Sequence, residues 1–187
     1  LMLTTLGFAL STFSFAGLAL LIIFSRQEQI HSSRLLATAA IMSSLWSSVL
    51  GFQAYGYPLP LVFLFAIEIL RGGLWLVFLL SLIQTLGKIG RSRLIAVGIW
   101  IAILLAGIVL DALYRLGVID FGVGSLLPSV GLFLSVTVLL AVEQLYRNCP
   151  PGSKWALKFF CLGIVTIFGY DLFLYSQALL VNSISLD

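Results

Sequence analysis

Charged residues are scarce in this sequence. Lysine, arginine, aspartate and glutamate together make up 9% of its 187 residues, whereas 61% are hydrophobic, and the mean hydropathy is +1.16. A soluble domain needs more polar surface than this composition can supply. The composition therefore excludes an ordinary soluble enzyme and indicates an integral membrane protein. In such a chain the net charge of +3 bears on orientation and gives no support for nucleic-acid binding.

Residues that bind metals or act as catalysts are also few. The one histidine, His31, is predicted in a polar loop, and the two cysteines, Cys149 and Cys161, lie too far apart along a helix to form a disulfide. Metal and haem sites therefore lack support. Residues 122–125, Gly-Val-Gly-Ser, superficially resemble a protease loop, yet His31 is predicted on the other side of the bilayer, and no phosphate-binding loop occurs. We predict no catalytic residue and no cofactor in this chain.

Long apolar runs divide the chain into six segments that could each cross a bilayer. A transmembrane helix needs about 20 consecutive apolar residues. Runs of that kind cover residues 3–24, 35–55, 61–86, 94–114, 124–144 and 155–180. We therefore expect an all-α polytopic membrane protein, a bundle of about six transmembrane helices that forms a single domain over residues 1–187. We also expect this domain to be a fragment of a longer protein.

Basic residues favour one orientation of the bundle. They flank the first, third and fifth predicted connections, whereas the second and fourth contain none apart from Arg115 at a helix end. Loops rich in lysine and arginine stay in the cytoplasm. We therefore predict that both termini are extracytoplasmic. A faint inverted repeat of three helices, of a kind found in transporters, is weakened because Glu68 and Asp171 fall at different positions within their helices.

Three charged residues interrupt the apolar helices. Glu68 and Arg71 lie in the third predicted helix, and Asp171 lies in the sixth. At about 1.5 Å per residue, all three lie roughly 10–15 Å below the outer ends of their helices, so they share one layer. An ionised side chain at that depth costs about 2.5–3.5 kcal/mol unless it finds a partner or a cavity. We predict that Arg71 pairs with Glu68 in its own helix and with Asp171 across helices.

Three interpretations of this cluster remain open. It is a polar clamp between two helices, a sensor of a ligand or of protons, or part of an ion or substrate pathway. Nearby aromatic residues could add hydrogen-bond donors and walls: Trp75, Tyr170 and Tyr175. By contrast, two pairs at helix ends, Asp111 with Arg115 and Glu143 with Arg147, are predicted to be interfacial pairs of small energetic weight.

Two further segments bear on packing. Ala39, Ser43 and Ser47 recur at four-residue spacing in the second predicted helix, and such small residues can form a packing face. The connection before the sixth helix contains two prolines, which stiffen the chain, and a tryptophan that can anchor the helix at the interface. We predict a cytoplasmic connector of fixed shape that includes Tyr146, Arg147, Asn148, Lys154 and Trp155.

Two stretches of the chain resemble a known family. The first is residues 68–71, Glu-Ile-Leu-Arg, followed by residues 75–80, Trp-Leu-Val-Phe-Leu-Leu. The second comprises residues 143–148, Glu-Gln-Leu-Tyr-Arg-Asn, then Pro150-Pro151, residues 154–159, Lys-Trp-Ala-Leu-Lys-Phe, Gly169-Tyr170-Asp171 and Tyr175. Together they look like the N-terminal membrane region of the PrsK sensor histidine kinases of the PEP-CTERM/exosortase system.

The resemblance implies a function. In that family the membrane region is the signal input and precedes a cytoplasmic GAF-like domain and a histidine kinase core. This implies a multi-pass domain in the bacterial inner membrane whose partners are the lipid bilayer, a second copy in a homodimer, and a response regulator reached through the kinase. ATP and Mg would belong to the kinase core, which these residues do not include. The alternative is a small six-helix transporter or channel-like protein.

Overall fold

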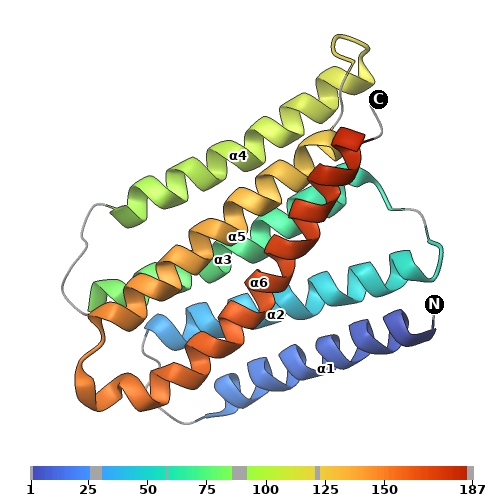
Figure 1. Ribbon diagram of the computed structural model, residues 1–187. Coiled ribbons are helices and arrows are strands. Elements are labelled where there is room, and N and C mark those ends of the chain that lie inside the picture. Colours follow the sequence, from blue (N-terminus) through green and yellow to red (C-terminus); the bar gives the residue numbers. More distant parts are fainter. Residues whose placement is uncertain (1, 26–30, 58, 86–91, 121–122, 185–187) are drawn as a thin grey trace.

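Each of the six predicted spans forms a helix in the computed structural model (Figure 1), which describes residues 2–25, 31–57, 59–85, 92–120 and 123–184. The helices are α1 Met2–Phe24, α2 His31–Ala54, α3 Leu61–Thr85, α4 Ser92–Arg115, α5 Val123–Asn148 and α6 Lys154–Ile184, with a 3-10 turn, η1, at Pro151–Ser153. All six are long and apolar enough to cross a membrane. The predicted all-helical fold is thereby confirmed, and these helices indicate a multi-pass membrane protein.

Several helices extend beyond the apolar runs. α2 begins at His31 and not at residue 35, so the predicted loop position of His31 is wrong. α5 continues to Asn148, past the predicted end at residue 144. A helix can continue into polar sequence because its backbone hydrogen bonds persist there, while long side chains extend to the membrane interface. Hydropathy therefore locates each span but not its ends.

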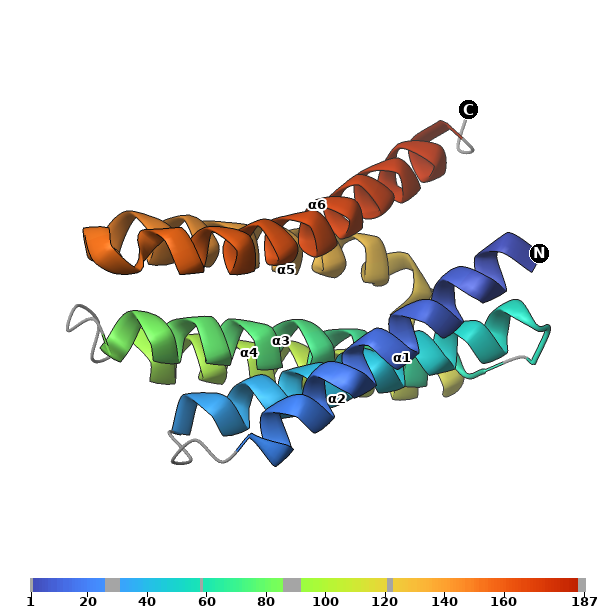
Figure 2. The same ribbon diagram turned by 90° about the horizontal axis from the view of Figure 1, so that it is seen from below.

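The helices form two layers (Figure 2). α5 and α6 lie together in one layer, and α1, α2, α3 and α4 lie in the other. Within the described residues, the Cα atoms of α6 come within 8 Å of those of α5 and η1 only, whereas α3 approaches α2, α4 and α5 this closely. α3 is thus the central helix. In the part of the chain that the structure describes, the backbones of the two layers come close only where α5 packs against α3 and α4.

Glycines let α3 approach its neighbours. A Cβ on Gly72 would collide with the side chain of Leu134 in α5, and a Cβ on Gly73 would collide with the indole of Trp100 in α4. Small residues permit such close approach between membrane helices, where packing takes the place of the hydrophobic effect as the driving force. These two glycines therefore hold α3 at the centre of the bundle.

The small-residue stripe on α2 is a packing face, as its spacing predicts. Ala39, Ser43 and Ser47 are all buried. The hydroxyls of Ser47 and Ser11 of α1 share a hydrogen bond of 2.8 Å, and Ser43 accepts one of 2.9 Å from Nε1 of Trp75 in α3. The stripe therefore joins α2 to helices on both sides.

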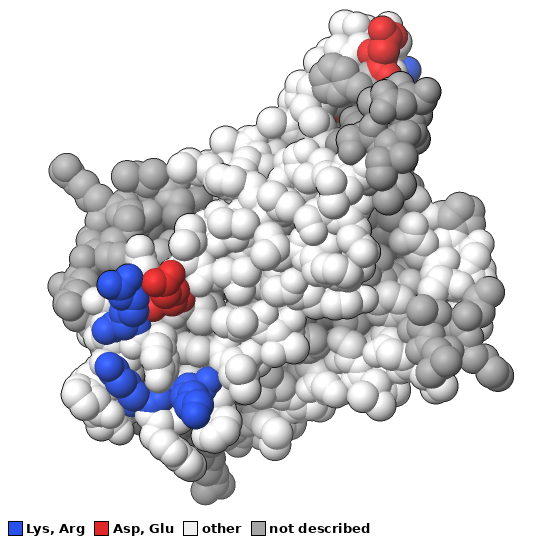
Figure 3. Space-filling view, in the orientation of Figure 1, with Lys and Arg blue, Asp and Glu red and all other residues white. Residues whose placement is uncertain are grey.

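Charged side chains on the face shown in Figure 3 gather at two ends of the bundle. Basic side chains crowd the end where α5 leads into α6, and an uncharged band separates them from the charges at the far end of α4. α1 begins and α6 ends at the end opposite the α5–α6 connection (Figure 1). An uncharged band between two charged rims is the pattern expected of a bundle that crosses a bilayer.

Candidate functional site

Arg71 of α3 lies at the centre of a buried ion cluster. Its Nη2 donates hydrogen bonds to Oε1 of Glu68 at 2.6 Å and to Oδ2 of Asp171 at 2.5 Å. Arg71 is 2% exposed, Glu68 6% and Asp171 4%. The predicted contact between the third and sixth helices is therefore present, with Glu68 sharing the guanidinium.

The two contacts of Arg71 have different structural consequences. Glu68 and Arg71 are three residues apart and so occupy one face of α3, which allows them to pair without any tertiary contact. Asp171 belongs to α6, in the other layer, and no Cα atom of α6 comes within 8 Å of α3 among the described residues. The long arginine side chain thus bridges two layers whose backbones are well separated at this point.

Trp46 of α2 completes the cluster and was not predicted. Its Nε1 donates a hydrogen bond to Oε2 of Glu68, and its ring lies 4.0 Å from Cζ of Arg71. The ring of Phe168 in α6 lies 5.4 Å from the same carbon. Aromatic faces attract a guanidinium at these distances. The signal that could have identified Trp46 is its position in the middle of a span, since membrane tryptophans usually lie near the interfaces.

Two of the three aromatic residues predicted to support the cluster lie beside it. Tyr175 lines a cavity together with Glu68, and its ring occupies the space that the absent side chain of Gly131 leaves on α5. Tyr170 lies in the same helix, next to Asp171 in sequence, and lines two cavities beside the cluster with 61% of its surface exposed. Both are therefore positioned to contact a molecule that approaches the cluster.

Trp75 does not belong to the cluster. It lies one turn further along α3 than Arg71, donates its Nε1 hydrogen bond to Ser43, and packs edge-on against Phe78 with ring centroids 6.1 Å apart. The structure places Trp75, predicted to support the cluster, about 6 Å further along α3 in the apolar core shared by α2, α3, α5 and α6.

Two cavities adjoin the cluster between α6 and the helices α1, α2 and α3. The larger has a volume of about 450 Å³ and is bordered by Arg71 and Asp171. The smaller has a volume of about 350 Å³ and is bordered by Glu68 and Asp171. Both fall in the size range of small-molecule sites, about 300–1,000 Å³. Four residues line both cavities: Phe8, Trp46, Tyr170 and Asp171.

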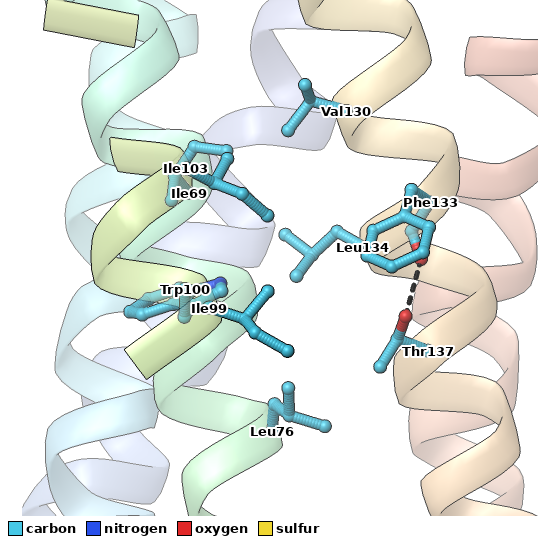
Figure 4. Close-up of a pocket in the computed structure, with 9 residues that line it drawn as sticks. All are labelled: Ile69, Leu76, Ile99, Trp100, Ile103, Val130, Phe133, Leu134 and Thr137. Carbon is cyan, nitrogen blue, oxygen red and sulfur yellow. Dashed lines mark hydrogen bonds between the residues drawn. The ribbon is translucent and has the colours of Figure 1, made fainter. Parts of the chain in front are cut away.

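A third cavity, between α3, α4 and α5, is smaller and apolar (Figure 4). Its volume is about 110 Å³, and the side chains that point into it are almost all aliphatic or aromatic. The hydroxyl of Thr137 is directed to the backbone carbonyl of Phe133, to which it donates a hydrogen bond of 2.8 Å. None of the lining residues is charged, and Nε1 of Trp100 is buried without a hydrogen-bond partner among the described residues.

The predicted connector before the sixth helix is shorter than expected. Tyr146, Arg147 and Asn148 form the last turn of α5, and Lys154 and Trp155 begin α6. Only residues 149–153 lie between the helices, because the residue before a proline is disfavoured in a helix and Pro150 therefore stops α5. The five predicted residues thus lie on two helix ends and not in one loop.

Other candidate ligands are dispersed. No group of three or more His, Cys, Asp or Glu side chains that could hold a metal ion occurs within the described ranges. Cys149 and Cys161 are both buried free thiols. Trp155 is largely exposed and stacks edge-on with Phe159, ring centroids 5.3 Å apart. The Arg71 cluster and its cavities are therefore the site on which a functional proposal can rest.

Comparisons of this chain with protein-family models, with curated proteins and with solved structures found no match. The resemblance to PrsK membrane regions accordingly stays a prediction.

Proposed function

We propose that this chain is the membrane-embedded signal-input domain of a bacterial sensor histidine kinase, with the Arg71 cluster as the element that responds to the signal. The observation that carries the proposal is the buried contact between Arg71 and Asp171, which joins the two helix layers. Moving the layers apart would leave the buried carboxylate of Asp171 without its partner, at a high free-energy cost. The cluster thus favours one packing of α6 against the remaining helices, and a change in the cluster alters that preference.

The cluster has features that a plain clamp does not need. Nε of Arg71 is buried without a hydrogen-bond partner among the described residues. Two carboxylates also share a single guanidinium, and ligand-sized cavities reach both acids. Buried polar groups that are incompletely satisfied are costly and call for an explanation beyond stability. These features support a responsive site over a purely structural one.

A molecule in these cavities would contact both layers at once. Residues of α1, α2 and α3 line one side of both cavities, and residues of α6 line the other. A ligand shifts an equilibrium between two packings only as far as its affinities for them differ. A ligand that contacts Asp171 has such a difference, because it competes with Arg71 for the same carboxylate.

The kinase part of the proposal is supported by the resemblance of residues 68–80 and 143–175 to PrsK membrane regions. It implies that the domain lies in the inner membrane, acts as a homodimer, and passes its signal to a kinase core that binds ATP and Mg and phosphorylates a response regulator. The orientation is supported by the basic residues, which indicate cytoplasmic connections at the end of the bundle where α5 meets α6.

Autophosphorylation of the full-length protein tests this function. In native membranes supplied with radiolabelled ATP, the wild-type protein should incorporate phosphate, and Asp171→Asn should change the rate at least about fivefold, the lower range of allosteric coupling. Asp111→Asn, which neutralises a pair at a helix end, is the matched control and should leave the rate unchanged. Absence of phosphate incorporation by the full-length protein would overturn the proposal.

A transporter is the second candidate, because charged residues beside a cavity deep in a bundle also characterise transport pathways. It requires that the reconstituted chain moves a solute between the two sides of a liposome. Flux that is abolished by Asp171→Asn and unaffected by Asp111→Asn would favour this candidate over the sensor.

The proposed orientation has its own test. Single cysteines substituted at Pro58 and Arg91, two positions outside the described residues, lie in connections predicted on opposite sides of the membrane. A membrane-impermeant thiol reagent added to intact cells should label the cysteine at position 58 and not the one at 91. The reverse pattern would show that the termini are cytoplasmic.

A further inference from the structure

We propose that the two cavities beside Asp171 form a binding site for an organic cation, an amine or quaternary ammonium group on a small molecule. The inference deepens the proposed signal-input function and rests on it only for the consequence of binding. The site itself is argued from charge, aromatic lining and size, and it can be tested without any kinase.

The charges of the cluster favour a cationic ligand. Arg71 is the one cation in contact with Glu68 and Asp171 among the described residues, so the ionised cluster carries an excess of one negative charge. An uncompensated buried charge is costly, and a bound cation would offset it. An anion entering the same space would meet two carboxylates and a guanidinium already shared between them. Charge therefore selects a positively charged ligand.

Two hydroxyl groups of the larger cavity already have partners. Ser11 shares a hydrogen bond with Ser47, and Thr166 donates one to the carbonyl of Leu162. Asp171 contacts Arg71 through Oδ2 and also lines both cavities. The carboxylate of Asp171 is thus the charged anchor that an incoming ligand reaches from either cavity.

The residues around the cavities favour an organic cation over a metal ion. A metal ion needs several oxygen, nitrogen or sulfur ligands, and the described part of the chain contains no group of three or more suitable side chains. Aromatic residues instead line both cavities, namely Phe8, Tyr170 and Trp46, the last with its ring also in contact with Arg71. Aromatic faces beside a carboxylate bind ammonium groups that carry apolar substituents. The lining therefore matches an organic ammonium group.

Binding of radiolabelled choline tests the site. Choline is a quaternary ammonium probe, and dimethylbutanol is its uncharged isostere. The 187-residue chain in phosphatidylglycerol nanodiscs should bind choline saturably, and dimethylbutanol should compete at least about tenfold less well than unlabelled choline, a difference of about 1.4 kcal/mol. Equal competition by the two compounds would show an apolar crevice without charge selection and would overturn the inference, as would absence of saturable binding.

Variants assign the binding to Asp171. Asp171→Asn retains an oxygen acceptor for Arg71 but removes the negative charge, and it should weaken choline binding at least about tenfold. Asp111→Asn makes the same chemical change at a helix end and should bind like the wild type. If Asp171→Asn fails to fold, Tyr170→Leu replaces it, because this exposed side chain lines both cavities; it should weaken binding about two- to fivefold. Wild-type affinity in either folded variant would overturn the inference.

Nanodisc composition identifies the source of the cation. Phosphatidylcholine carries the same ammonium group as the probe, so reduced choline binding in phosphatidylcholine nanodiscs would identify a lipid headgroup as the ligand, and unchanged binding would identify a free solute. Both results support the site.

The binding site and the sensory function can fail separately. Choline binding without any effect on autophosphorylation would overturn the proposed sensory function and leave the binding site intact. A kinase that responds to Asp171→Asn but whose membrane domain binds no choline would overturn the binding site and leave the sensory function intact.

Discussion

Two kinds of acid–arginine pair occur in this protein, and they differ in environment more than in chemistry. Asp111 and Arg115 are 2.8 Å apart at the end of α4, with 63% of the arginine side chain exposed. The pair of Glu143 and Arg147 near the end of α5 is longer, at 3.2 Å, and more exposed. The Arg71 cluster has comparable distances but is almost completely buried.

The difference shows that the spacing of two charged residues in the sequence does not determine how much their ion pair contributes to stability. Partners three or four residues apart on a helix meet in both environments. At the exposed ends, water and salt screen the charges, and each pair contributes at most about 1 kcal/mol. In the buried cluster, removing one partner strands the others in an apolar region, which costs about 3–5 kcal/mol. The Arg71 cluster differs from the surface pairs in two ways: it is buried, and it includes a second acid, Asp171, from α6.

The largest expected effect comes from Arg71→Leu. The change strands two carboxylates and should lower the free energy of unfolding in mixed detergent micelles by about 3–5 kcal/mol. Arg71→Leu combined with Asp171→Leu should recover part of this loss, because one stranded charge is then removed. If the two single losses simply add in the double variant, the residues are not coupled.

A smaller effect is expected from Trp46→Phe. The ring and its packing are largely kept, but the hydrogen bond from Nε1 to Glu68 is lost. A hydrogen bond to a charged group is worth about 1.5–3 kcal/mol, and the unfolding free energy should fall by that amount. Trp155→Phe, at the exposed start of α6, serves as the control and should change it by less than about 0.5 kcal/mol. Equal effects at the two positions would mean that the hydrogen bond is unimportant.

The pair at the end of α4 should be nearly neutral. Arg115→Leu should change the unfolding free energy by no more than about 1 kcal/mol, because the guanidinium is exposed and its pair is screened. A loss similar to that of Arg71→Leu would contradict the distinction between buried and exposed pairs.

The smallest effect concerns salt. Raising the ionic strength from about 0.1 M to about 1 M shortens the Debye length from about 10 Å to about 3 Å. The residual contribution of Arg115, measured as the difference between the wild type and Arg115→Leu, should therefore disappear at high salt. The corresponding difference for Arg71→Leu should stay the same, since its partners have little contact with the solvent. A marked salt dependence of the Arg71 contribution would show that water reaches the cluster.

The sequence by itself determined the six apolar spans and the three charged members of the cluster. Hydropathy alone locates six spans, because a bilayer core requires about 20 apolar residues in each. The depth of Glu68, Arg71 and Asp171 follows from counting residues along those spans, and the cost of an unpaired charge in an apolar region makes their pairing a strong expectation. Hydropathy, the rise of a helix per residue and the thickness of a bilayer are enough for these predictions.

Only the tertiary structure decided what surrounds the cluster. Trp46 joins it because α2 lies against α3, and Trp75 lies outside it because it is four residues, about 6 Å, further along α3, where Ser43 and the core surround it. The cavities exist because α6 stays close to α5 while standing apart from α1 and α2. Helix spacing and rotation depend on side chains distant in sequence, such as Gly72 against Leu134 and Gly131 against Tyr175. Each helix alone has no preferred neighbour in lipid, so its partner and facing side are fixed only when all the helices pack together.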